Sequence, residues 1–316
     1  MANTPYSFFD LRVVRAERLS PSFVRVTFGG AELASFVNGG RDQRLKIFLP
    51  RPGQDAPVVP RSADLSWYPE WRAMDPAVRG VMRTYTVREH RRDPHEVDID
   101  FALHGDTGPA SRWAATAAPG DRVTLLGPSA EENGGVDFQP PGLGGVPATD
   151  ARGNPRPATT WVLITADETA LPAVASTLAW LPAGTPAKVW IEVQHAEDRQ
   201  ALPTKADADV TWLVRDEIPA PQPATPDAQL THGQLTHGQR TLDAVRAAEL
   251  PDGTPYAWVA GESSTVRALR RHLVGERGFD RKAVKFTGYW RQGTSEDQLL
   301  DQEAEDTGDA ADAGDE

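Results

Sequence analysis

The hydrophobic pattern of this 316-residue chain changes near its middle, and this change limits the folds that the chain can adopt. In the first half, short apolar runs follow one another with little helix between them. Val97, Ile99, Phe101 and Leu103 alternate with other residues, and a period of two describes a half-buried strand. Six such runs predict a six-stranded antiparallel barrel. The runs span residues 11–18, 23–28, 45–49, 83–88, 97–103 and 123–126.

The second half alternates continuous apolar strands with helical patterns. A strand–helix alternation of this kind implies a doubly wound parallel sheet, with helices on both of its faces. The predicted strands span residues 161–165, 189–193, 210–214, 256–260 and 284–289, and the predicted helices span 169–181, 241–249 and 265–276. The predicted fold class is therefore β followed by α/β.

The length and the pattern divide the chain into two domains of ordinary size. We predict a barrel over residues 1–128, a Gly/Pro-rich linker or loop over 129–157, and an α/β domain over 158–293 with an irregular insertion at 219–239. Residues 294–316 form an acidic tail, and Ser295–Glu316 holds ten acidic residues and no basic one. Its composition predicts disorder, and the alternative role is a docking arm for a basic partner.

The charge and the cysteine content exclude several classes of protein. The net charge is −12 and no basic run occurs, which argues against a nucleic-acid-binding protein. The chain contains no cysteine, so it has no disulfide, no thiolate metal site and no iron–sulfur cluster of its own. The first twenty residues lack an apolar signal region, and no run reaches transmembrane length. We therefore expect a soluble cytoplasmic protein with no membrane insertion.

The insertion contains a tandem duplication, in which Gln229–Gly233 and Gln234–Gly238 both read Gln-Leu-Thr-His-Gly. Two short copies cannot build a solenoid, which needs three or more packing units. His232 and His237 are metal-ligand types, but no other ligand stands near them in the sequence. The pattern favours a loop that arose by slippage, and we predict no metal site.

A strand with alternating chemistry is the first candidate for a cofactor site. Arg83, Tyr85 and Val87 fall on one face of an extended strand, and Thr86 and Arg88 fall on the other. A flavin site needs cations for the pyrophosphate, a flat aromatic surface for the ring, and a small hydroxyl near the reactive nitrogen. The alternative is an exposed strand whose arginines are solvated.

The second candidate begins where a strand ends at Leu103. A turn that carries glycine follows, and a helix begins near Pro109, since proline suits the first helical turn. The free backbone N–H groups of such a turn form an anion site, to which Ser111 adds a hydroxyl. This segment is a candidate pyrophosphate cradle, and the alternative is an ordinary capped helix.

These segments together resemble the siderophore-interacting proteins, a family of ferredoxin-reductase-like flavoproteins. The resemblance runs in the order of that family from about residue 11 to residue 293. The segments that carry it are Arg41–Pro50, Arg83–Arg88, Gly108–Ala114, Ala166–Pro172, Ala260–Glu262 and Gly288–Gly293.

The resemblance implies that the barrel binds FAD and that the second domain is of the NAD(P)H-binding type. Arg83 and Arg88 would pair with the FAD phosphates, Tyr85 would pack on the isoalloxazine ring, and Thr86 would bond near N5. His104 would lie near the adenine or simply end its strand. The remaining cofactor-binding candidates are Gly108, Pro109, Ala110, Ser111, Asp167 and Glu262, and the last two are either helix caps or flavin-edge residues.

The resemblance also implies a ferric siderophore as the substrate, reduced to release Fe(II). Such substrates are often anionic, and we predict a substrate patch formed by Lys46, Arg112, Arg291 and Lys285. Each of these four is otherwise a surface charge or an ion-pair partner. Electron transfer requires no general acid or base, so we predict none.

The electron donor stays open among NADH, NADPH and reduced ferredoxin. Where related flavoproteins carry a Gly-rich turn and a Cys-Gly pair, this chain holds Asp167–Thr169 and Gly261–Glu262. Carboxylates near a helix N-terminus repel a nucleotide phosphate. The alternative functions are a general NAD(P)H-dependent flavin or ferric-chelate reductase, and a flavin-binding siderophore accessory protein with little turnover.

Overall fold

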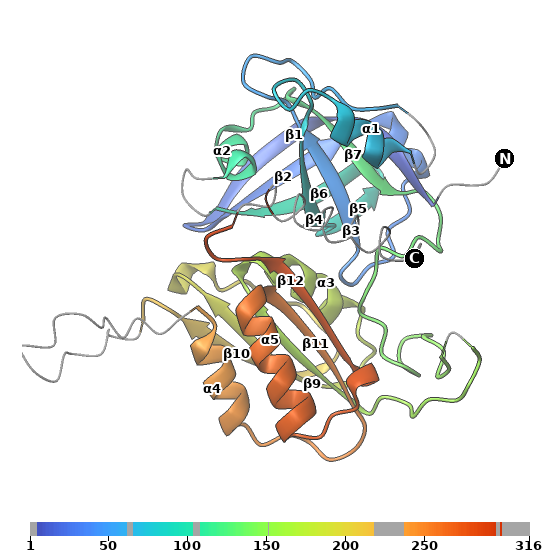
Figure 1. Cartoon of the computed structure of the whole chain (residues 1–316), viewed down its shortest axis with the longest axis vertical. Helices are drawn as coiled ribbons and strands as arrows, with labels where there is room; N and C mark the ends of the chain where they lie inside the picture. The colour runs from blue at the N-terminus through green and yellow to red at the C-terminus, as the bar shows by residue number, and fades with distance from the viewer. Residues whose placement is uncertain are drawn as a thin grey trace, which may run out of the picture.

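Two sheets, one after the other along the chain, form the protein (Figure 1). The computed structural model describes residues 5–61, 66–103, 108–150, 152–217, 237–294 and 298. The first sheet has seven strands in the order β4-β3-β7-β1-β2-β6-β5, and all of its pairings are antiparallel. Its strands are β1 Tyr6–Ser20, β2 Phe23–Gly29, β3 Arg44–Leu49, β4 Val81–Thr86, β5 Glu89–Arg92, β6 His95–Ala102 and β7 Arg122–Pro128.

The antiparallel sheet confirms the predicted architecture but corrects the predicted count of six strands. The strand that the sequence missed is β5, which pairs with β6 over four residues, Glu89–Arg92. Its residues are all polar, so it has no apolar alternation by which it could be recognised. The sheet curls until β4 contacts β6, and Arg88 N donates to Asp98 O at 2.9 Å across this join.

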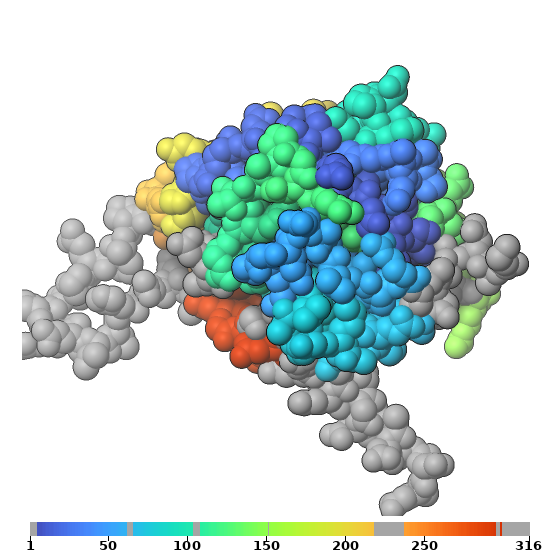
Figure 2. Space-filling view, turned by 90° about the horizontal axis from the view of Figure 1, so that it is seen from above, coloured from blue at the N-terminus to red at the C-terminus, as the bar shows by residue number. Residues whose placement is uncertain are grey.

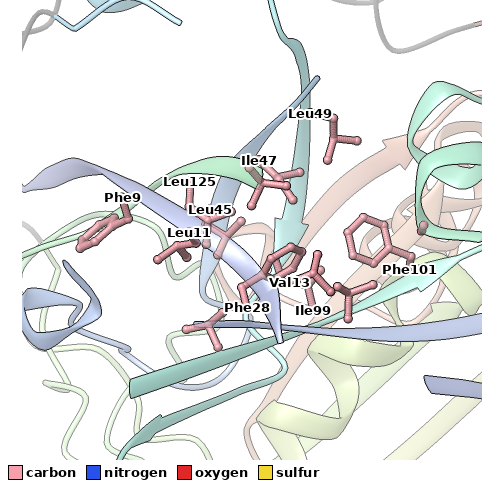
Figure 3. Close-up of a cluster of buried hydrophobic side chains, with 14 of the residues drawn as sticks. Phe9, Leu11, Val13, Phe28, Leu45, Ile47, Leu49, Ile99, Phe101 and Leu125 are labelled. Atoms are coloured by element: carbon pink, nitrogen blue, oxygen red, sulfur yellow. The ribbon is translucent and has the colours of Figure 1, made fainter. Parts of the chain in front are cut away.

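The barrel is filled by side chains that alternate inward along its strands (Figure 3). Val97, Ile99 and Phe101 of β6 point into this core, as the period of two predicts. The other face of β6 is buried too, because arginines cover its carboxylates. Arg25 Nε lies 2.7 Å from Asp100 Oδ1 and closes one end of that face. The strand is therefore more deeply buried than a half-exposed pattern indicates.

The second sheet confirms the predicted doubly wound arrangement. Its order is β10-β9-β8-β11-β12, and every pairing is parallel. The strands are β8 Trp161–Asp167, β9 Pro186–Val193, β10 Asp207–Val214, β11 Pro255–Glu262 and β12 Val284–Trp290. Helix α3, Leu171–Trp180, packs on one face against Val162 and Ile164, while α4, Gln239–Ala247, and α5, Ser263–Arg271, pack on the other.

The remaining helical elements are short. They are η1 Ala31–Ser35, α1 Trp67–Ala73, α2 Pro109–Thr116, η3 Glu168–Ala170, η4 Ala196–Asp198, the π-turn η5 His272–Glu276 and η6 Arg281–Ala283. The sequence did not predict α1, because a proline stands within its seven residues. Trp71 of α1 is buried on the outside of the barrel, and its Nε1 donates to Gly80 O at 3.1 Å. No helix in the described part of the chain combines the length and the apolar character that a membrane span needs.

The two sheets share a packed interface. Phe23 of the barrel is fully buried in the core of the α/β domain, and Asp198 accepts hydrogen bonds from Ser20 Oγ at 2.6 Å and Ser22 N at 3.1 Å. Phe138, between the domains, is also fully buried. In Figure 1 the carboxyl end of β12 lies toward the barrel, and Figure 2 shows that the barrel covers most of this end of the molecule. The α/β domain therefore presents its strand ends to the barrel.

Candidate functional site

Strand β4 separates two kinds of side chain by its pleat. Arg83 and Tyr85 lie opposite Ile47 and Leu45 of β3 and turn toward the barrel core. Tyr85 is half-buried, and its ring centroid lies 4.4 Å from that of Phe101. Arg83 is 7% exposed, and its Nη1 donates to Met82 O at 2.7 Å. The strand therefore holds a guanidinium and an aromatic ring side by side in fixed positions.

Arg88 follows β4 and lies beside the carboxylate face of β6. Its Nε is 3.6 Å from Asp100 Oδ2 and has no hydrogen-bond partner among the described residues. Burial lowers the pKa of Arg88, and the neighbouring Asp100 opposes that shift. The carbonyl of Arg88 accepts a hydrogen bond from Ser176 Oγ of α3 at 3.1 Å. Arg88 thus lies at the domain interface, and its Nε–H is available for a further hydrogen bond. Its contact with an FAD phosphate stays a prediction.

Helix α2 begins at Gly108 without a capping side chain in the described part of the chain, and its first turn contains no acidic residue. Pro109 occupies the first turn, as the sequence predicts. Ala110 and Ala114 are buried in the barrel core, so the start of the helix is fixed against the sheet, and α2 contacts β4. This helix start suits an anion. His104, the adjoining candidate, lies outside the described residues.

Thr84 and Thr86 lie on the opposite face of β4, where the α/β domain approaches. Thr86 lies close to the phenol of Tyr289 of β12, and burial raises the pKa of that phenol. The Tyr289 ring meets Trp258 edge-on at a centroid distance of 6.4 Å. Trp258 Nε1 in turn donates to the buried carboxylate of Asp42 at 3.2 Å. The predicted flavin-edge hydroxyl therefore lies against the second domain.

Tyr289 was not among the predicted site residues. It lies within Gly288–Gly293, one of the segments that carried the family resemblance, so the sequence pointed to the segment but not to the residue. Thr86 and Tyr289 are 203 positions apart, and only the packing of the two domains joins them.

Two of the four predicted patch residues come close to Thr86. Lys46 Nζ donates to Thr84 Oγ1 at 3.1 Å, and Lys285 Nζ lies 2.9 Å from Asp137 Oδ1. Asp137 also pairs with Arg44, whose Nη1 lies 3.0 Å from Oδ2. Arg44 shares a strand face with Lys46 and lies opposite Thr86 in the β3–β4 register. Arg44, Lys46 and Lys285 therefore form one basic group, which we call the basic rim.

Arg112 and Arg291 are the other two predicted patch residues. Arg112 is exposed on α2, and Arg291 is exposed directly after β12. Their convergence with the basic rim stays a prediction. Arg44, which the sequence did not single out, takes a place in the rim through Asp137, a residue of the segment between the domains.

Asp167 and Glu262 both act as helix caps at the carboxyl edge of the parallel sheet. Asp167 Oδ1 accepts from Thr169 N at 3.0 Å, and its Oδ2 accepts from Glu262 N at 2.8 Å. Glu262 Oε2 accepts from the backbone N–H groups of Ser264 and Thr265 at 2.7 and 3.0 Å. Burial raises the pKa of each carboxyl, but hydrogen bonds outweigh it and hold both pKa values low. At Asp167 these come from the side chains of His237, Thr169 and Trp290. At Glu262 they come from the Ser264 hydroxyl and from the backbone N–H groups of Thr265 and Ser264.

His237 joins the same edge from the second copy of the duplication. Its Nε2 lies 3.2 Å from Asp167 Oδ2, and its ring meets Trp290 edge-on at 4.9 Å. Trp290 Nε1 also donates to Asp167 Oδ2, at 2.9 Å. The sequence missed this cluster because His237 and Trp290 stand 70 and 123 positions from Asp167 along the chain. The duplication was the available signal, but it gave no partner for His237.

Comparison with known proteins accounts for both halves of this arrangement. Residues 12–132 match the model of the siderophore-interacting FAD-binding domain, and residues 159–293 match that of the siderophore-interacting protein. A siderophore utilization protein from T. fusca has a crystal structure that is 31% identical, covers 92% of this chain and 95% of its own, and gives a TM-score of 0.68. This chain belongs to the siderophore-interacting protein family.

Two relatives of this chain are named for the reactions that they catalyse. The ferric vibriobactin reductase of Vibrio cholerae is 29% identical and aligns over 91% of this chain and 90% of its own length. The NADPH-dependent ferric-chelate reductase of Escherichia coli is also 29% identical, over 90% of this chain and 92% of its own. The match therefore spans both domains in each case.

The residues at β4 and α2 fit FAD. An uncapped helix start accepts the charge of a pyrophosphate, and the buried guanidinium of Arg83 lies on the strand that α2 contacts. The half-buried ring of Tyr85 offers a flat surface, and Thr86 ends the same strand with a hydroxyl. These are the three groups that a flavin dinucleotide needs.

Proposed function

We propose that the protein is an FAD-dependent reductase of ferric siderophores that releases Fe(II) in the cytoplasm for iron assimilation. The observation that carries the proposal is the basic rim, which surrounds the Thr86–Tyr289 contact at the end of the flavin strand. The two relatives named as ferric reductases support it, and NADH or NADPH is the proposed donor. The absence of cysteine suits a reducing compartment.

The barrel would hold FAD through groups that are already in position. The N–H groups of the first turn of α2, with Ser111, would bind the pyrophosphate, and Arg83 would neutralise its charge. Tyr85 would pack on the isoalloxazine ring, and Thr86 would hydrogen-bond at its edge. FAD supplies a centre that accepts a hydride and passes electrons on singly.

Tyr289 would orient the hydroxyl of Thr86. A tyrosine phenol is protonated at neutral pH, and burial raises the pKa of Tyr289 further, so its O–H would be available to donate to Thr86 Oγ1. The Thr86 hydroxyl then keeps its own hydrogen for the flavin edge. The buried Asp42 and Trp258 support Tyr289 from behind and exclude water from this side.

The basic rim would attract and place the substrate. Ferric siderophores carry oxygen donors and often a net negative charge, which three clustered cations favour electrostatically. Ferric iron is a hard cation held by these oxygens. Addition of one electron gives Fe(II), which the same ligands hold less tightly, so the metal leaves. No residue needs to transfer a proton for this step.

The test separates the flavin–iron step from the donor. The purified FAD-loaded protein is photoreduced without oxygen and mixed with ferric hydroxamate or ferric catecholate complexes in the presence of a ferrous-iron trap. We expect fast flavin reoxidation with two trapped Fe(II) for each fully reduced flavin, because reduced FAD carries two electrons and each ferric iron takes one. A flavin that stays reduced would refute the proposal and would favour an accessory protein.

A matched pair of variants tests the basic rim. Lys285→Ala removes a rim cation, whereas Lys188→Ala removes a lysine that pairs with Asp209 on the outer strands β9 and β10. We expect Lys285→Ala to slow reoxidation by an anionic complex about 5- to 10-fold, because one partly screened charge is worth about 1 kcal/mol or more. Lys188→Ala should leave the rate unchanged.

The second candidate function is a general ferric-chelate reductase, which the name of the Escherichia coli relative favours. It predicts equal rates with ferric siderophores and with small chelates of matched charge. A siderophore preference of tenfold or more would exclude it, while reduction of the flavin by ferredoxin in place of NAD(P)H would revise only the donor.

A further inference from the structure

Dinucleotides bind doubly wound sheets where the strand order reverses, with the pyrophosphate on the N-terminus of a helix. In this protein the order reverses between β8 and β11, and both strands lead into a helix at that point. At each of these helix starts, a carboxylate side chain of the protein already accepts the free backbone N–H groups. Asp167 accepts the N–H of Thr169 after β8, and Glu262 accepts those of Ser264 and Thr265 after β11.

Buried carboxylates also gather at this edge, where the other charged groups include His237 and the exposed Arg291 after β12. Four carboxylates lie at this edge, each 6% exposed or less: Asp167, Glu168, Glu192 and Glu262. Arg215 forms ion pairs with two of them, at 2.6 Å to Glu168 and 3.3 Å to Glu192. The guanidinium of Arg240 donates to the carbonyls of residues 214 and 215. The sequence of residues 218–236 contains neither lysine nor arginine.

The space for a phosphate is also filled. Gly261 sits where a closely approaching backbone would meet a pyrophosphate, but a Cβ added there would come within 2.6 Å of Asp167 Oδ2. The indole of Trp290 and the imidazole of His237 both bond to the same carboxylate. Phosphate oxygens would therefore have to displace bonds that the chain makes with itself.

We propose that the described residues at this edge form no phosphate subsite, so that a nicotinamide donor is recognised through its dihydronicotinamide riboside portion alone. The inference rests on the proposed function. The C4–H bond of the dihydronicotinamide breaks, its hydride passes to oxidised FAD with one proton from solvent, and the nicotinamidium leaves. NADPH, NADH, reduced nicotinamide mononucleotide and reduced nicotinamide riboside are then equivalent donors in the chemical step.

The test compares these four donors in stopped-flow reduction of the FAD-loaded protein without oxygen. We expect second-order rate constants within about threefold of one another, which corresponds to less than about 0.7 kcal/mol of phosphate contribution. We also expect the rate with NADPH to rise with added salt, because screening weakens the repulsion of its phosphates, while the rate with the neutral riboside stays constant. A dinucleotide preference of about 30-fold or more would overturn the proposal.

A variant pair examines the cause. Glu168→Gln removes one carboxylate and leaves Arg215 able to meet a phosphate, so it should speed reduction by NADPH about 10-fold and leave the riboside unchanged. Glu217→Gln, which breaks the exposed pair between Glu217 and Arg199, is the control and should change neither rate. An equal effect of Glu168→Gln on both donors would contradict the charge argument.

Failure of this inference is distinguishable from failure of the proposed function. If none of the four donors reduces the flavin, the inference is wrong, but photoreduced protein can still be tested with ferric siderophores. If the photoreduced flavin is not reoxidised by them, the proposed function is wrong even when the four donors act alike. The wild-type donor comparison needs no variant to fold.

Discussion

The helix starts of the two domains differ in whether a carboxylate of the protein caps them. In the barrel, α2 begins at Gly108 with no capping side chain among the described residues and no acidic residue in its first turn. In the α/β domain, η3 and α5 begin at Asp167 and Glu262, and each carboxylate caps its own helix. The same backbone geometry is thus a candidate anion site in one domain, as far as the described residues show, and a self-neutralised end in the other. The difference teaches that a helix start indicates a phosphate site only where the chain leaves it uncapped.

The most direct test of this comparison is to introduce a capping carboxylate at the start of α2. Gly108 has φ −100° and ψ 137°, which any residue adopts, and among the described residues an added Cβ would meet Ser111 Cβ alone, at 3.8 Å. Gly108→Asp should therefore fold, with a few tenths of a kcal/mol gained from the new cap. It should weaken FAD about 100-fold or more, because a fixed carboxylate repels the pyrophosphate.

Fluorescence titration of the apoprotein with FAD measures this effect. Gly108→Asn is the matched control, since it caps the helix without a charge and should weaken FAD far less. Unchanged affinity in Gly108→Asp would show that the pyrophosphate lies elsewhere.

A second substitution measures how much Arg83 of the barrel contributes to FAD binding. Arg83→Lys keeps the charge but removes the planar fork that bonds phosphate at two points. We expect FAD to bind about 10-fold more weakly, which is the loss of one charge-assisted hydrogen bond. Arg92→Lys, at an exposed arginine of β5, should have no effect. Equal affinities in both variants would remove Arg83 from the phosphate site.

Removal of a helix cap in the α/β domain is expected to change the stability of the protein and not its affinity for FAD. Glu262→Ala removes the cap of α5 and should lower the free energy of unfolding by about 1–2 kcal/mol. Chemical denaturation measures it, with the exposed Glu249→Ala as the control. FAD affinity should stay the same. A large loss of FAD affinity would instead place Glu262 at the flavin edge.

The smallest expected effect concerns His237. Burial opposes its protonation, but the hydrogen bond to Asp167 and the charges of Asp167 and Glu168 outweigh burial and raise the pKa of His237. A raised pKa stabilises the fold fully below about pH 6.5, the unfolded value, and this contribution disappears as pH rises through the folded value. The difference in unfolding free energy between wild type and His237→Gln should thus shrink by about 1 kcal/mol or less above pH 6.5. A difference that does not vary with pH would contradict the ion pair.

The two regions were also unequally predictable. The apolar alternation of β6 and the continuous runs of β8 to β12 predicted an antiparallel sheet followed by a doubly wound parallel one, because periodicity is a local property. The same reasoning missed β5 and α1, since an all-polar strand of four residues and a short helix with an internal proline carry no such period. At the site, the start of α2 could be predicted from Gly108 and Pro109, but whether a side chain caps it could not.

The sequence by itself determined which segments are candidates for a site: the Arg83–Arg88 strand, the start of α2, and the carboxylates that begin η3 and α5. Only the tertiary structure decided which of them meet. Thr86 meets Tyr289, Asp137 joins Arg44 to Lys285, and His237 reaches Asp167. Caps and pleats depend on neighbours a few residues away, so a sequence can specify them locally. Contacts across 50 to 200 residues depend on how two sheets pack, and that is settled by the buried surface between them.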